Sequence, residues 1–147
     1  MLLHGSCAAF QGAGVLFLGP SGSGKSDLVL RLMQEGWQLV ADDQVLLRDG
    51  NGPMADAPPS LAGMLEVRGV GIFRNLPHGP APLRLVVELG PQNSIPRLPL
   101  PDSFALPGGN LPRLRLNAFE ASAAAKLSLA LAAAEARLQQ CAGAFAA

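Results

Sequence analysis

The chain is poor in aromatic and charged residues: in 147 residues there is no tyrosine and one tryptophan, and only 15% of the residues are charged. Basic and acidic residues balance at 11 each, and lysine and arginine form no cluster. A protein that holds nucleic acid by electrostatic attraction needs a basic surface. The composition therefore argues against a nucleic-acid partner.

Cysteine and long apolar runs are also scarce. Cys7 and Cys141 lie near opposite ends and lack the spacing of a metal site, so we expect free or buried thiols, as in a reducing cytoplasm. No apolar run reaches membrane-spanning length, and the N-terminus lacks the basic residues of a secretion signal. We expect a cytoplasmic protein without a membrane partner, folded as one domain over 1–147.

The most informative segment that is present is Gly19-Pro20-Ser21-Gly22-Ser23-Gly24-Lys25-Ser26, which matches G-x-x-x-x-G-K-[ST] at every fixed position. In such a P-loop the glycines let backbone N–H groups surround phosphate. Lys25 then reaches the β- and γ-phosphates, and the Ser26 hydroxyl can bind Mg²⁺. The segment predicts nucleotide binding.

The flanks of this segment decide against a glycine-rich turn with an incidental lysine. Residues 14–18 form an apolar run that predicts a buried strand. After Ser26, apolar residues at 28, 29, 32 and 33 share one helical face, and Gly36 is placed to end the helix. Strand, loop and helix N-terminus thus follow in the order that phosphate binding requires.

The rest of the chain predicts an α/β domain with a mixed sheet. Strands are expected at 39–41, 44–47 and 83–89, with a hairpin turn at 49–52 and a short element at 61–65. Prolines recur between 91 and 112, which predicts short edge strands and an exposed loop there.

A C-terminal helix is expected at about 118–140, after a catalytic body at about 4–116. Its sequence is rich in alanine, and Leu127, Leu131, Ala134 and Leu138 recur at helical spacing. We interpret it as a helix that covers the core rather than one that binds a partner.

Two acids, Asp42 and Asp43, follow the predicted strand at 38–41, where P-loop proteins place a carboxylate for the metal. Asp42 suits Mg²⁺ or its water shell, and Asp43 could accept the proton of an attacking hydroxyl. The competing interpretation is a turn at a strand end with two solvated acids.

A second pair of charges, Glu66 and Arg68, lies in the segment Leu65-Glu66-Val67-Arg68-Gly69-Val70-Gly71-Ile72. Strand alternation places both side chains on one face, where they suit a metal and a phosphate. By itself such a pair is more typical of a surface ion pair.

Taken together, His4-Gly5, the P-loop, Leu39–Asp43 and Leu65–Ile72 resemble the catalytic domain of bacterial HPr kinase/phosphorylase, whose signature is L-E-[IV]-R-G-[LV]-G-I. The resemblance runs from about His4 to about Leu116. It implies a P-loop fold related to phosphoenolpyruvate carboxykinase and transfer of phosphate from ATP to a serine of the carrier protein HPr. In many members it also implies phosphorolysis of the product, and it implies a hexamer.

The resemblance also implies roles for individual residues. Gly19 to Ser26 would hold the nucleotide, with Ser26 and Glu66 on Mg²⁺ and Lys25 on the transferred phosphoryl group. Asp43 would be the base of the kinase reaction and the acid of its reversal, with His4 in the same network. The expected catalytic set is His4, Lys25, Asp42, Asp43 and Arg68.

Two departures from the family pattern stand out. The chain begins three residues before His4, so we expect a truncated member without the usual N-terminal domain. Pro107-Gly108-Gly109-Asn110 replaces a P-G-R-N segment linked to phosphorolysis, which puts the reverse reaction in question. Arg97, Arg113 and Arg115 could supply the lost charge, although solvent-facing positions on edge strands are the simpler interpretation.

The leading functional prediction is an ATP- and Mg²⁺-dependent serine kinase that acts on an HPr-like phosphocarrier protein. The alternative is a nucleotide-sensing module with weak or no transfer, against which the three acids Asp42, Asp43 and Glu66 argue. A small-molecule kinase is disfavoured because no arginine-rich lid segment is present.

Overall fold

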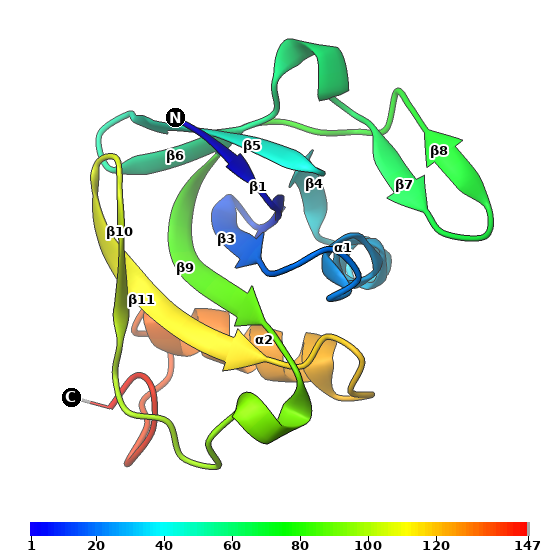
Figure 1. The fold of residues 1–147 in the computed structure, drawn as a ribbon. Helices are drawn as coiled ribbons and strands as arrows, with labels where there is room; N and C mark the ends of the chain where they lie inside the picture. Colours follow the sequence, from blue (N-terminus) through cyan, green and yellow to red (C-terminus); the bar gives the residue numbers. More distant parts are fainter. Residues whose placement is uncertain (147) are drawn as a thin grey trace.

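The computed structural model describes residues 1–146, and Figure 1 shows a curled sheet flanked by helices. The main sheet contains β1 Leu2–His4, β2 Ser6–Phe10, β3 Ala13–Leu18, β4 Gln38–Ala41, β5 Gln44–Asp49, β6 Pro53–Asp56, β9 Ala81–Leu89, β10 Ser103–Leu106 and β11 Gly109–Leu116. Its order is β1-β5-β6-β9-β3-β2-β4, with β11 beside β9 and β10 beside β11.

Strand directions make the sheet mixed. The β3–β9 and β9–β11 pairs are parallel, and the hairpins β2–β3, β5–β6 and β10–β11 are antiparallel. The predicted turn at 49–52 joins β5 to β6, with the Gly50 N–H donating to the Gly52 carbonyl. The prediction of an α/β fold with a mixed sheet is confirmed.

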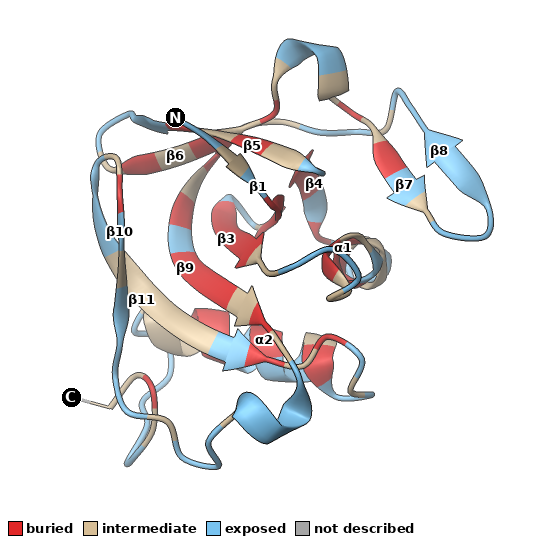
Figure 2. Ribbon diagram, viewed as in Figure 1, coloured by how far each residue is buried: buried red, intermediate tan, exposed pale blue. Residues whose placement is uncertain are grey.

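The two faces of the sheet bury different side chains. Along β3, Val15 and Phe17 point to one hydrophobic cluster and Leu16 to the other, and all three are fully buried. This alternation follows from the two-residue period of a strand. Helices cover the first face, whereas β5, β6 and β10 contribute Leu47, Ala55 and Leu106 to the cluster on the second. Figure 2 shows many of the buried residues in the central strands β3 and β9.

Two helices pack on the first face: α1 Lys25–Gln34 and α2 Ala123–Ala134. Their leucines Leu28, Leu32, Leu127 and Leu131 are buried in one cluster, as the spacing predicts. After α1, Gly36 adopts φ 92° and donates to the Met33 carbonyl, so the helix ends where the sequence indicates. Neither of these two helices is long and apolar enough to cross a membrane.

A small second sheet carries the signature segment. Strands β7 Leu65–Val67 and β8 Gly71–Phe73 form a hairpin that extends from the body in Figure 1. Leu65 is buried and anchors it, whereas all of β8 is exposed (Figure 2). The element predicted at 61–65 is displaced: a 3₁₀ turn spans Pro59–Leu61, and the strand begins only at Leu65.

The prediction of short edge strands among the prolines is wrong for β11. This strand has eight residues and a neighbour on each side, β9 and β10. Pro112 is tolerated because its pairing is with Ser103 on β10 only, and the pairing with β9 begins one residue later at Arg113. The missing N–H of Pro112 therefore removes no hydrogen bond between β9 and β11.

The predicted helix at 118–140 is too long at both ends. Residues before Ala123 form a turn in which the Asn117 side chain accepts from the Phe119 N–H. At the other end Ala136 adopts φ 59°, and the Arg137 and Ala136 N–H groups donate to the Ala132 and Ala133 carbonyls. This Schellman motif stops the helix, and Leu138 is exposed beyond it. No glycine marks the stop, so the sequence carried no signal for it.

Replacing Ala136 with glycine should stabilise the protein, because glycine adopts the left-handed conformation without the penalty of a Cβ atom. We expect the free energy of unfolding, measured in urea, to rise by about 0.5 to 1 kcal/mol. The matched control is Ala125→Gly, at an exposed position within α2, which should lower it by about 1 kcal/mol. Equal destabilisation by both variants would contradict the assigned helix end.

The two cysteines should differ sharply in reactivity. Both are free thiols; Cys7 is fully buried, which raises its pKa, whereas Cys141 is exposed. We expect Ellman's reagent to modify one thiol rapidly in the native protein and two in guanidinium chloride. Cys141→Ser should abolish the rapid reaction. Two rapid thiols in the native state would show that the β2 core opens readily.

Candidate active site

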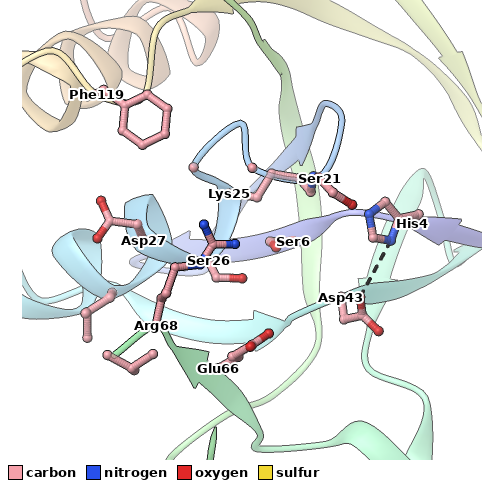
Figure 3. Close-up of a pocket in the computed structure, with 14 residues that line it drawn as sticks. His4, Ser6, Ser21, Lys25, Ser26, Asp27, Asp43, Glu66, Arg68 and Phe119 are labelled. Carbon is pink, nitrogen blue, oxygen red and sulfur yellow. Dashed lines mark ion pairs between the residues drawn. The ribbon is translucent and has the colours of Figure 1, made fainter. Parts of the chain in front are cut away.

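One cleft collects the residues that the sequence singled out. It has a volume of about 310 Å³ and is lined by His4, Lys25, Ser26, Asp43, Glu66 and Arg68 together with Ser21, Gly22 and Gly24 of the P-loop. Figure 3 shows their side chains converging from β1, the P-loop, the β4–β5 turn and β7. The segments are far apart in sequence. The strand order of the main sheet brings β1, the P-loop and the β4–β5 turn together, and the separate β7–β8 hairpin adds Glu66 and Arg68.

Within the P-loop, Lys25 folds back over the loop. Its ammonium group donates to the Gly19 and Pro20 carbonyls at 2.5 and 3.0 Å. Burial lowers the pKa of Lys25, and the carboxylates of Asp42 and Asp43 act in the opposite direction. The charge is thus held at the loop, where phosphate oxygens can replace carbonyls as acceptors.

Two loop glycines are required by space as well as by backbone conformation. Gly24 has φ 96°, and a Cβ atom there would lie 2.8 Å from the Ala118 Cβ and 3.2 Å from the Phe119 ring. Gly19 has φ 152°, and its Cβ would meet the Ser23 hydroxyl at 2.7 Å. Any side chain at either position would push the loop away from its neighbours.

Beneath the loop, the Asp42 carboxylate is a buried hydrogen-bond centre. Only 6% of the residue is exposed. Its Oδ1 atom accepts from the Ser26 hydroxyl at 2.7 Å and from the Ser6 hydroxyl at 2.8 Å. Its Oδ2 atom faces the Glu66 N–H at 3.4 Å. The interpretation of Asp42 as a solvated acid at a strand end is therefore wrong.

Asp43 lies in a strained turn immediately after Asp42. The Gln44 N–H donates to the Asp42 carbonyl at 2.8 Å, which makes Asp43 the central residue of a γ-turn with φ 69°. The Gly5 N–H holds this turn by donating to the Asp43 carbonyl at 3.1 Å. A non-glycine residue in this region is costly, and such strain concentrates at functional sites. The turn leaves the Asp43 side chain exposed in the cleft.

The His4 ring lies beside the Asp43 carboxylate. The Nδ1 atom of His4 lies 3.6 Å from Oδ1 of Asp43, an approach marked by the dashed line in Figure 3. The pairing of His4 with Gln44 across β1 and β5 sets this distance. Because both side chains are more than half exposed, their interaction contributes little stability. The pair is available for contact with a ligand.

Glu66 and Arg68 both line the cleft, one on β7 and one directly after it. They form no ion pair with each other in residues 1–146, so the interpretation of a surface ion pair is not supported there. Both side chains are exposed. The β7 segment thus adds a carboxylate and a guanidinium to the lining of the cleft.

The segment from Pro107 to Asn110 does not reach the cleft. It forms the β10–β11 turn, where a Cβ on Gly108 would lie 2.6 Å from the Gly52 backbone. Arg113 pairs with Asp102 at 2.7 Å and with Glu88 at 2.9 Å. The hydrogen bond from Arg113 lowers the pKa of Asp102. Within this chain, Gly109 therefore removes no charge from the cleft.

The substitute arginines do not supply charge to the cleft either. Arg113 and Arg115 line a separate shallow groove, and Arg97 lines neither cavity.

Sequence reasoning missed Ser6 and Phe119. Ser6 is a polar residue at the start of the apolar strand Ser6–Phe10, and only 1% of it is exposed. A buried hydroxyl needs a partner, so its place in that strand was a usable signal. Phe119 lines the cleft from the turn before α2 and carried no sequence signal.

Removing the Ser6 hydroxyl should disturb Asp42 and, through it, Ser26. For Ser6→Ala we expect the free energy of unfolding to fall by about 1 to 2 kcal/mol and the affinity for a nucleotide, with ATP as the probe, to fall about 5- to 10-fold. Affinity by titration calorimetry, with and without Mg²⁺, measures the second effect. Ser128→Ala, exposed on α2, is the control. A loss of stability with unchanged affinity for ATP would reduce Ser6 to a packing role.

Comparisons with known proteins agree with this geometry. The family model "HPr Serine kinase C-terminal domain" matches residues 1–76, which include every predicted site residue. HPr kinase/phosphorylase of Clostridium botulinum strain Eklund 17B is 44% identical over 72 residues, which are 48% of this chain and 24% of that protein. HPr kinase/phosphorylase 1 of Oceanobacillus iheyensis is 44% identical over 73 residues, again 48% of this chain and 24% of the relative.

The fold extends beyond the matched sequence. The solved structure of the Hpr(Ser) kinase/phosphatase from Coxiella burnetii covers 93% of this chain, and 97% of that chain is covered in turn, with a TM-score of 0.80 at 21% identity. The sequence matches span about a quarter of the length of the curated relatives. On the family match over residues 1–76, this chain belongs to the HPr serine kinase C-terminal domain family.

Proposed function

We propose that this chain is an ATP-dependent protein-serine kinase whose substrate is an HPr-like phosphocarrier protein. The observation that carries the proposal is the shared cleft: the P-loop residues Lys25 and Ser26 line one part of it, and the exposed carboxylate of Asp43 lines another. A phosphate donor and a hydroxyl acceptor need these two features within one site.

The P-loop supports the nucleotide half of the reaction. Backbone N–H groups of Gly22 to Ser26 lead into the N-terminus of α1, where the helix dipole favours an anion. Lys25 adds a localised positive charge. The Ser23 hydroxyl oxygen is buried and has no hydrogen-bond partner in residues 1–146.

The residues present also fit Mg²⁺, which would neutralise phosphate charge in the cleft when bound. Ser26 and Glu66 offer the hard oxygen donors that this ion prefers, and Asp42 orients Ser26 from below. No group of three His, Cys, Asp or Glu side chains in residues 1–146 forms a metal cluster by itself. That agrees with Mg²⁺, which in phosphate sites takes only one or two carboxylates and keeps several waters.

We assign Asp43 the role of the base, because its carboxylate is exposed in the cleft beside the P-loop. As the serine hydroxyl of the substrate attacks the γ-phosphorus, Asp43 accepts its proton. A bond forms from the serine oxygen to phosphorus, the bond to the β–γ bridging oxygen breaks, and ADP leaves. His4 beside Asp43 orients the carboxylate, and Lys25 and Arg68 hold the phosphate oxygens.

The exposure of Asp43 favours a protein as the acceptor. About 64% of the Asp43 side chain and 54% of the His4 side chain are exposed, so a serine on another protein can reach them. The relatives named HPr kinase/phosphorylase indicate which protein this is. Gly109, which stands where the family pattern has arginine, does not line the cleft of this chain. Its presence is therefore no argument against the reverse reaction at this cleft.

The kinase proposal predicts transfer of the γ-phosphate of labelled ATP to one serine of a purified HPr-like phosphocarrier protein. Asp43→Asn should lower the rate at least about 100-fold, because proton transfer by a positioned base contributes about that much. Asp49→Asn, in the β5–β6 turn outside the cleft, should retain activity. Mass spectrometry of the phosphorylated phosphocarrier identifies the serine. Incubating that product with the enzyme and inorganic phosphate tests whether the phosphoserine is phosphorolysed.

Two results would overturn the proposal. Tight ATP binding without transfer to any phosphocarrier would favour the alternative, a nucleotide-sensing module. Full activity of Asp43→Asn would show that another group accepts the proton.

A further inference from the structure

Phe119 is an aromatic residue whose apolar side chain is exposed to water in the cleft. About 65% of it is accessible, and it lines the cleft that contains the P-loop. It lies outside residues 1–76, so the family match assigns it nothing. In Figure 3 its ring stands on the same side of the cleft as Asp27, whereas His4 and Asp43 lie on the opposite side.

The proposed function sets the direction in which a triphosphate would lie in the cleft. The γ-phosphate must lie near Asp43, which receives the proton, and Lys25 spans the β- and γ-phosphates. The α-phosphate then lies at the start of α1, and the nucleoside must leave the cleft at the end away from Asp43. Two cleft-lining residues that Figure 3 labels lie towards that end: Asp27 and Phe119.

Phe119 is held in place by its neighbours in the turn before α2. The Asn117 side chain accepts from the Phe119 N–H at 3.0 Å. The Arg31 guanidinium donates to the carbonyl of Ala118, a buried residue, and so links α1 to this turn. Arg31 is itself paired with Asp27 at 3.1 Å. The peptide group that joins Ala118 to Phe119 is therefore anchored through both its carbonyl and its N–H, although the ring is exposed.

The ring also lies directly against the P-loop. A Cβ atom on Gly24 would come within 3.2 Å of the Cε1 and Cζ atoms of Phe119. Gly24 thus leaves room for the ring beside the loop that holds the phosphates. An anchored aromatic face at the nucleoside end of a phosphate site is suited to stack on a planar base.

We propose that Phe119 is the platform on which the base of the nucleotide stacks, an inference that rests on the proposed use of ATP. Leu30 also lines the cleft, and the Asp27 carboxylate is already paired with Arg31. Stacking uses the face of the base rather than its edge. Phe119 therefore contributes to affinity for the nucleoside and makes no contribution to the phosphates.

The test compares ATP with inorganic tripolyphosphate, each with Mg²⁺, on the full chain by titration calorimetry. Phe119→Ala should weaken ATP binding roughly 10-fold and leave tripolyphosphate binding unchanged. Phe119→Tyr should restore ATP binding. In the kinase assay, Phe119→Ala should raise KM for ATP and change kcat little. Leu129→Ala, equally exposed on α2 but outside the cleft, is the matched control.

Each other outcome has one meaning. Unchanged ATP affinity in Phe119→Ala would overturn the stacking proposal while leaving the kinase proposal intact. An equal loss for ATP and tripolyphosphate would show that Phe119 only supports the P-loop, and would also overturn it. If the wild-type protein binds ATP no better than it binds tripolyphosphate, the base makes no contact and the proposal is wrong. If it binds neither, the proposed kinase function itself fails.

Discussion

The hydrogen bonds to the buried Asp42 carboxylate are the interaction on which the site depends. One oxygen accepts from Ser6 on β2 and from Ser26 on α1, so a single atom joins two strands and the first turn of a helix. A buried carboxylate without these donors would be strongly destabilising, because desolvation penalises its charge. The P-loop position, the end of β4 and the start of β2 are therefore set together.

This constraint separates the roles of two adjacent acids. The γ-turn at Asp43 reverses the chain directly after Asp42, so that one carboxylate points into the protein and the other into the cleft. The Gly5 N–H stabilises the turn from the neighbouring segment, and the β1–β5 register places His4 beside Asp43. The hydrogen bond from Gly5, directly after β1, thereby offsets strain in the backbone, and the proposed base is held without being buried.

Local sequence predicted the elements whose signals are local. The strand before the P-loop, α1 and its end at Gly36 were predicted correctly because apolar spacing and glycine report on a few neighbouring residues. The end of α2 was not predicted correctly. It depends on the left-handed conformation of Ala136, and an alanine in the sequence gives no signal for that conformation. The central position of β11 was also missed: Pro112 suggests an edge, and only the register shows that its pairing with β9 begins later.

The sequence by itself determined which groups are available for chemistry: a P-loop with Lys25 and Ser26, the acid pair, and Glu66 with Arg68 in a segment typical of one family. Only the tertiary structure decided their arrangement. It buried Asp42 and exposed Asp43, brought Ser6 beneath the loop, and placed Phe119 beside Gly24. The physical reason is that burial and contact across a curled sheet depend on strand order and register, which are properties of the whole chain rather than of any short segment.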